Sequence, residues 1–174
     1  MRRMLIIVLI AVAALTGGAV PASANTGTSP PGGGWVPVSY PPYDAPAGLL
    51  CDFPVHWDVV VNHVRTKVVA TYPDGSPQRQ LAVGALFLRV SNVDTGARTL
   101  VDASGSAVIT YGTDGSMVWF VVGPVIARIP AGSSNLPRGM YTITGVYRVA
   151  FSPTGFKTIT LVHGRIHNLC PDLA

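Results

Sequence analysis

Glutamate is absent from this chain of 174 residues, and all eight of its acidic residues are aspartate. Lysine is almost as scarce, because it occurs only at Lys67 and Lys157. Long helices depend on Glu, Lys, Ala and Leu, and the chain also carries 19 glycines and 15 prolines, which argues strongly against a helical bundle or coiled coil. Only 11% of the residues are charged and 48% are hydrophobic, so a wholly disordered protein is excluded. The composition therefore predicts a small β-rich protein.

A secretory signal peptide is predicted over residues 1–24. Arg2 and Arg3 precede an unbroken apolar run from Met4 to Leu15, and the segment ends in the small-x-small pattern Ala22-Ser23-Ala24. The apolar run is shorter than the ~20 residues that a membrane-spanning helix needs. We therefore expect cleavage before Asn25, a secreted protein, and no stable membrane insertion after cleavage.

The mature chain that remains is nearly neutral. Cleavage removes two arginines, so ten Lys or Arg residues (12 − 2) are balanced against eight aspartates. No two basic residues are adjacent in the mature chain, so there is no polybasic stretch that would neutralise phosphates or an anionic lipid surface. Nucleic acid and membrane surfaces are therefore not expected as partners.

Residues 25–48 form a lead-in that is rich in proline and glycine. Six of these 24 residues are proline and five are glycine, so the segment is expected to be extended and partly disordered. It carries Trp35, Tyr40 and Tyr43. These aromatic residues either dock on the following domain or contact a cell-wall polymer.

The domain proper is predicted over residues 49–174, with Cys51 near its start and Cys170 near its end. In an exported protein, an even pair of cysteines most simply forms one disulfide, which here would join the first and last strands. Two thiolates alone do not complete a zinc site, and no Cys-x-x-Cys motif is present for redox chemistry. No metal or other cofactor is expected.

Turn signals built on Asp-Gly, Thr-Gly and Ser-Gly pairs separate short β-branched and apolar runs. These runs predict eight strands: Val55–His63, Thr66–Tyr72, Leu81–Ser91, Arg98–Ala103, Ala107–Gly112, Met117–Ile129, Met140–Phe151 and Phe156–Ile166. Short connections predict an antiparallel all-β meander that forms a closed or nearly closed barrel, with a β-sandwich as the alternative.

Two details of these strands add to the prediction. Gly84, Gly123 and Gly145 fall inside strands, where glycine often marks a bulge or a sharp bend. The runs Leu81–Leu88 and Met117–Val122 are apolar on both faces. Either the sheet is covered on both sides there, or one face lines an apolar cavity or a subunit contact.

Several of these motifs together resemble a known group of proteins. They are Cys51-Asp52-Phe53-Pro54-Val55, the turns Ser91–Gly96, Ser104–Ser106 and Thr113–Ser116, Gly123, and the closing segment from Gly164 to Asn168-Leu169-Cys170. With this pattern the chain resembles uncharacterised small secreted β-proteins of high-GC Gram-positive bacteria. The resemblance implies export and a β-fold, and it implies no particular activity or site.

Motifs for catalysis are absent from the sequence. A glycosidase needs two opposed carboxyl groups, but Asp74, Asp94 and Asp114 lie in turns, where aspartate commonly caps backbone amides. No Gly-x-Ser-x-Gly motif occurs, and both cysteines are assigned to the disulfide. No catalytic residue is therefore assigned.

One candidate polar site remains. His163, Arg165 and His167 alternate along the last strand and should share a face, while His56 and Asp58 share a face of the first strand. The Cys51–Cys170 bond would bring the two groups near each other. The alternative interpretation is that all five are solvated residues on the outside of the sheet near the chain ends.

Three functions are consistent with the sequence. The first is a secreted, disulfide-stabilised, non-catalytic binding or structural module, whose partner would be an apolar small ligand or a surface. The second is a small extracellular isomerase or hydrolase that uses the His/Arg site at a barrel mouth. The third is a cell-wall-associated protein that uses the aromatic lead-in. The first is the one that we favour.

Overall fold

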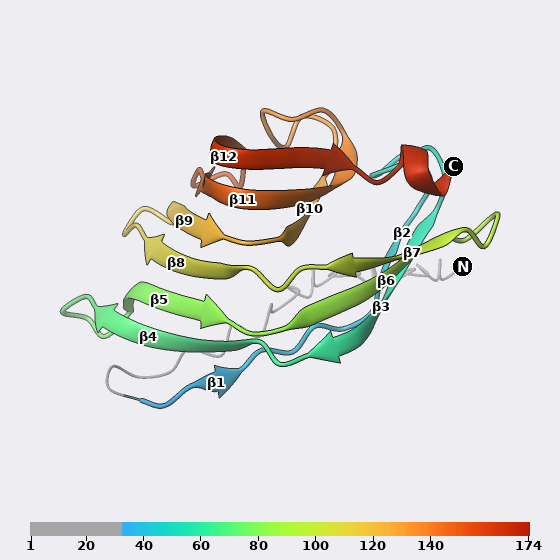
Figure 1. The fold of residues 1–174 in the computed structure, drawn as a ribbon. Helices are drawn as coiled ribbons and strands as arrows, with labels where there is room; N and C mark the ends of the chain where they lie inside the picture. The colour runs from blue at the N-terminus through green and yellow to red at the C-terminus, as the bar shows by residue number, and fades with distance from the viewer. Residues whose placement is uncertain (1–32) are drawn as a thin grey trace, which may run out of the picture.

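The computed structural model describes residues 33–174 of the chain (Figure 1). The predicted signal peptide and the first part of the lead-in lie outside the described residues. The described part contains twelve β-strands, one short 3-10 helix and no α-helix. The elements are β1 (Val36–Pro37), β2 (Tyr43–Ala45), β3 (Val55–Asn62), β4 (Arg65–Thr71), β5 (Pro77–Val83), β6 (Leu86–Asn92), β7 (Arg98–Asp102), β8 (Ser106–Tyr111), β9 (Met117–Val122), β10 (Val125–Ile129), β11 (Gly139–Phe151), β12 (Lys157–Asn168) and η1 (Pro171–Leu173). Within this part of the chain, no helix is long and apolar enough to cross a membrane.

The strands form two antiparallel sheets. In the larger sheet the order is β1-β4-β5-β8-β9-β11, and the long strand β11 also pairs with β10, beside β9, and with β12 on its other side. The smaller sheet has the order β2-β3-β6-β7. Figure 1 shows β8 and β9 in the middle of the larger sheet, between β4 and β5 on one side and β11 and β12 on the other.

All eight predicted strands are present, and the all-β antiparallel prediction is confirmed. Two of the predicted strands are split in the structure. The run Leu81–Ser91 is divided between β5 and β6, and the run Met117–Ile129 between β9 and β10. The first of these divisions carries the chain from the larger sheet into the smaller one, whereas β9 and β10 both stay in the larger sheet.

A line of glycines crosses the larger sheet where these strands are interrupted. We call Gly84, Gly105, Gly123, Gly145 and Gly164 the glycine line. Gly105 N donates to Pro124 O (2.6 Å), Gly123 N donates to Gly145 O (2.8 Å), and Gly145 lies directly opposite Gly164. All members except Gly105 have a positive φ, between 102° and 133°. Backbones approach so closely there that a Cβ atom at position 84, 145 or 164 would lie under 3.0 Å from backbone atoms of the neighbouring segment, which explains why glycine occupies these bends.

The predicted closed or nearly closed barrel is not supported, because the two sheets do not close on each other. Among residues 33–174, β11 is the only strand that pairs with β12. On the other side of β12 only Lys157 and Ile159 are hydrogen-bonded, to the segment Ser133–Asn135, so the rest of that side is an open edge. At the opposite edge, β1 pairs over only Val36 and Pro37, and proline has no N–H to extend a ladder. The two sheets are also not paired with each other. The last strand of the smaller sheet, β7, pairs with β6 but not with β10 of the larger sheet. Two sheets are therefore present, which is the feature that the sandwich alternative requires.

Buried apolar side chains form two clusters on opposite faces of β11. In the first cluster, Trp57, Leu88 and other residues of the smaller sheet pack against Met140 of β11. The second cluster is centred on Tyr147 and Val121, which project from the other face of the larger sheet. The first cluster therefore joins the two sheets at the Met140 end of β11, and the second lies on the opposite face of the larger sheet.

The predicted disulfide is confirmed. Cys51 and Cys170 are bonded, with their Cα atoms 5.5 Å apart. Cys51 precedes β3 and Cys170 follows β12, so the bond joins the start of the first long strand to the end of the last. The same end of the chain is also held by Asn92, whose Nδ2 donates to Leu173 O (2.9 Å).

The described part of the lead-in is paired to the domain. β1 pairs with β4 and β2 pairs with β3. The Tyr43 ring packs on Trp57 with centroids 4.9 Å apart, and the guanidinium of Arg128 lies 4.2 Å from the Tyr43 ring centroid. Trp35 and Tyr40 remain exposed. The aromatic residues were expected either to dock on the domain or to contact a cell-wall polymer, and Tyr43 is docked on the domain.

Candidate functional site

Two of the predicted polar residues, His56 and Asp58, form a cluster with Asp44 of β2. His56 Nδ1 lies 2.7 Å from Asp44 Oδ1, and His56 Nε2 lies 3.1 Å from Asp58 Oδ1. Ionised carboxylates only accept hydrogen bonds, so both contacts form only when both ring nitrogens carry a proton. The hydrogen bonds to Asp44 and then Asp58 raise the pKa of His56. The cluster is therefore an exposed, proton-dependent contact that holds β2 to β3.

The three predicted residues of the last strand lie on one face of β12. His163, Arg165 and His167 pair in register with Val146, Thr144 and Thr142 of β11. All three are exposed. His167 Nε2 lies 2.6 Å from Asp172 Oδ2, which places this histidine beside the C-terminal segment.

The structure does not unite these two groups into one site. Within residues 33–174, no hydrogen bond or ion pair joins His56 or Asp58 to the three residues of β12. Within the same residues, no group of three or more His, Cys or Asp side chains is arranged to hold a metal ion. The sequence-based interpretation also missed Asp44 and Asp172, which partner His56 and His167. The signal for Asp44 was weak, because it lies in a proline-rich segment whose pairing is visible only in three dimensions.

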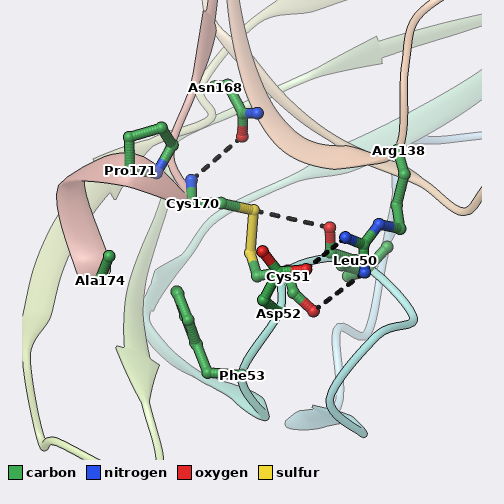
Figure 2. A pocket seen from close by; sticks show the side chains of 9 residues that line it. All are labelled: Leu50, Cys51, Asp52, Phe53, Arg138, Asn168, Cys170, Pro171 and Ala174. Carbon is green, nitrogen blue, oxygen red and sulfur yellow. Dashed lines mark hydrogen bonds and ion pairs between the residues drawn. A yellow bond between two sulfur atoms is a disulfide. The ribbon is translucent and has the colours of Figure 1, made fainter.

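A surface pocket with a volume of about 310 Å³ lies beside the disulfide (Figure 2). It is lined by the loop before β3, by Arg138 and by residues of the C-terminal segment. The guanidinium of Arg138 donates to Gly48 O (2.8 Å) and Cys51 O (3.4 Å) and forms an ion pair with Asp52. These contacts hold the loop before β3 in place, so the guanidinium of Arg138 has a structural role. None of the five predicted polar residues lines this pocket.

A broader feature is the face of the larger sheet opposite Val121 and Tyr147, which we call the exposed face. The strand register places one row of side chains across six strands on this face: Lys67, Leu81, Val108, Phe120, Arg148 and Thr160. Val118 and Val122 lie on either side of Phe120 on the same face of β9. Exposure is 38% for Val108, 48% for Phe120 and 52% for Val122. An apolar patch therefore lies open at the centre of the sheet.

The charged side chains that the strands place on the exposed face are all of one sign. Arg65, Lys67 and Arg79 lie on β4 and β5, and Arg148 and Arg165 lie on β11 and β12, so cations flank the apolar patch on both sides. No strand of the larger sheet contains an aspartate. Acidic residues lie outside these strands: Asp172 contacts His167 at the end of β12 (2.6 Å), and in the hairpin turns Asp74 and Asp114 accept hydrogen bonds from the backbone N–H groups of Ser76 and Ser116 (2.9 Å each). Hydrogen bonds from these serines lower the pKa of both carboxyl groups.

Comparisons of this chain with protein-family models, with curated proteins and with solved structures find no match. The resemblance to small secreted β-proteins of high-GC Gram-positive bacteria therefore stays a prediction.

Proposed function

We propose that this protein is an exported, non-catalytic binding module, and that the exposed face of the larger sheet is its binding surface. The observation that carries the proposal is the combination of open apolar side chains and single-sign charge on that face. Val108, Phe120 and Val122 are exposed together, and five Lys or Arg residues flank them. The ligand class that fits such a surface is an anionic amphiphile, which offers both an apolar part and a negative charge.

An exposed apolar patch favours binding because apolar surface is costly to leave in water. Burying apolar surface contributes about 25 cal/mol per Å², so a partner that covers the patch gains free energy without any conformational change in the sheet. Monomeric proteins seldom expose large contiguous apolar patches, and those that they do expose often mark interaction sites.

The predicted His/Arg residues support the enzymatic alternative less well than the exposed face supports binding. His56 is engaged by two carboxylates, His167 by Asp172, and none of the five residues lines the pocket beside the disulfide. General acid–base catalysis needs its groups within hydrogen-bonding reach of a common substrate. The exposed face is therefore the better basis for a function.

The proposal is tested with 8-anilinonaphthalene-1-sulfonate, a dye that is itself a small anionic amphiphile. We expect saturable binding to the folded protein, detected by dye fluorescence. Full burial of a Phe side chain contributes roughly 1.5–3 kcal/mol. Because about half of Phe120 is exposed, Phe120→Ser should weaken dye binding about three- to tenfold. The matched control is Leu100→Ser, which removes an exposed apolar side chain (60%) from β7 of the smaller sheet. Equal effects of the two variants, or no saturable binding at all, would remove the exposed face from the proposal.

The export part of the proposal has a separate test. Intact mass spectrometry of material secreted by the producing cell should show a chain that begins at Asn25 and lacks two hydrogens relative to its reduced form. A secreted chain that begins at Met1 would contradict the predicted cleavage.

A further inference from the structure

We infer that the natural partner of the exposed face is the surface of an anionic lipid bilayer, on which the larger sheet lies with its central strands toward the lipid. This inference rests on the proposed function and narrows its ligand from anionic amphiphiles in general to a membrane surface.

The cations on the exposed face lie in two groups that are far apart. Neighbouring strands lie about 4.8 Å apart, so Lys67 on β4 and Arg148 on β11, four strands away, are separated by roughly 19 Å. The cations therefore occupy two bands on either side of β8 and β9, and no aspartate lies between the bands. A small anion would contact one band only. An extended anionic surface contacts both bands at once, and each cation near such a surface strengthens binding about fivefold.

The apolar patch lies between the two bands of cations. Phe120 and Val122 of β9 and Val108 of β8 are open to solvent at the centre of the sheet. Long Lys and Arg side chains can reach lipid phosphates at the edges while the central side chains enter the acyl boundary. Amphipathic helices that lie in a membrane interface likewise combine basic side chains at the headgroups with apolar side chains that enter the acyl boundary.

Two other occupants fit the face less well. A second copy of the chain would bring the same five cations against each other, and like charges in contact disfavour association. A soluble polyanion would satisfy the cations, but it would leave Phe120, Val122 and Val108 in water. An anionic bilayer satisfies both the charges and the apolar side chains.

The test is co-sedimentation of the disulfide-bonded mature protein with vesicles of phosphatidylglycerol and phosphatidylcholine in equal parts. Vesicles of phosphatidylcholine alone and soluble polyphosphate are the two comparison probes. We expect binding to the mixed vesicles that weakens about fivefold in Arg148→Gln and in Lys67→Gln, and about three- to tenfold in Phe120→Ser. The matched controls are Arg98→Gln and Leu100→Ser on β7, whose side chains are also exposed, and both should bind like the wild type. Unfolding midpoints of all variants show whether each one is folded.

Each other outcome has a definite meaning. Equal binding to phosphatidylcholine vesicles would refute the requirement for anionic lipid. Binding to polyphosphate as tight as to mixed vesicles, with no effect of Phe120→Ser, would identify a soluble polyanion as the partner and overturn the inference. Dye binding that depends on Phe120, without any vesicle binding, would overturn the bilayer inference and leave the proposed binding surface standing.

Discussion

Substituting Gly145 by alanine tests whether the glycine line determines how this sheet is built. Gly145 lies in the middle of β11 with φ +110°, a conformation that side-chain-bearing residues rarely adopt. An added Cβ would lie 2.7 Å from Gly164 Cα and 2.9 Å from His163 C, and closer still to His163 O. All three atoms belong to the backbone of β12, so no change of rotamer relieves the contact.

The cost follows from three contributions. A residue held in a sparsely populated φ/ψ region costs roughly 1–3 kcal/mol. Moving packed backbone to admit an extra carbon typically costs another 1–3 kcal/mol. Alanine restricts the unfolded chain more than glycine does, which offsets about 0.4–1 kcal/mol. The expected net loss for Gly145→Ala is therefore about 3 kcal/mol in the free energy of unfolding.

Gly155→Ala is the matched control, because Gly155 also has a positive φ (85°) but a Cβ there would meet no atom within 4 Å. This variant keeps the conformational cost and lacks the backbone contact, so its expected loss is only about 1 kcal/mol. Urea unfolding followed by tryptophan fluorescence measures both variants under identical conditions. If Gly145→Ala lost no more stability than Gly155→Ala, close backbone approach would not be the reason for glycine at the bend.

Two further predictions concern the contacts that join distant parts of the chain. The Cys51→Ala/Cys170→Ala double variant removes a cross-link between residues 119 positions apart, and loop entropy predicts a loss of about 5 kcal/mol in the free energy of unfolding. Urea unfolding at matched pH measures this loss. A loss under about 1 kcal/mol would mean that the other contacts at the chain ends suffice. His56→Gln removes the proton-dependent contact with Asp44 and Asp58, which should cost up to about 1 kcal/mol for an exposed ion pair. Because the folded pKa of His56 is raised above its ordinary value of 6.5, this contribution is fully present below pH 6.5 and is lost as the pH rises through the folded value. The difference in unfolding free energy between wild type and His56→Gln should therefore shrink from pH 5.5 to pH 9, and a difference that is the same at both pH values would contradict the imidazolium assignment.

The strands were predictable because local chemistry decides where they begin and end. Asp74 and Asp114 each accept a hydrogen bond from the backbone of a serine two residues later, as expected for aspartate in a turn. Positive φ at Gly75 and Gly115 follows from the same turns. Such signals lie within a few residues of one another, so a single sequence reveals them.

Sheet closure was not predictable in the same way. Whether β12 meets the first strand depends on how far each bend at the glycine line turns the sheet, and this is a sum over several strands. Gly84, Gly123 and Gly145 were identified as bends, but the sequence does not contain the direction in which each bend turns. The closed or nearly closed barrel was therefore predicted from the number of strands, their short connections and the glycines within them, and the structure does not support it.

The exposed face was missed for a related reason. The mature sequence has no adjacent basic residues, but strand pairing gathers cations that are far apart in the chain. Lys67 and Arg148 belong to the same row across the sheet, although 81 residues (148 − 67) separate them. The sequence predicts that Met117–Val122 is apolar on both faces, and in the structure Val121 is buried whereas Phe120 and Val122 are exposed. The expectation that membrane surfaces are not partners rested on the missing polybasic stretch, and that criterion does not apply to a surface assembled by register.

The absence of glutamate explains how a nearly neutral chain acquires a face with one sign of charge. Aspartate is disfavoured in strands and favoured in turns, because its short side chain bonds to its own backbone. Glutamate has a weaker bias against strands and is the acid that would otherwise balance the arginines on an exposed strand. With aspartate as the only acid, negative charge is confined in the described residues to turns, loops, the C-terminal segment and the smaller sheet, where Asp44, Asp58 and Asp102 lie. The larger sheet then keeps its Lys and Arg residues without counter-charges in its strands, so net charge is a poor guide to the partner of this protein and the distribution of charge between the two sheets is the informative quantity.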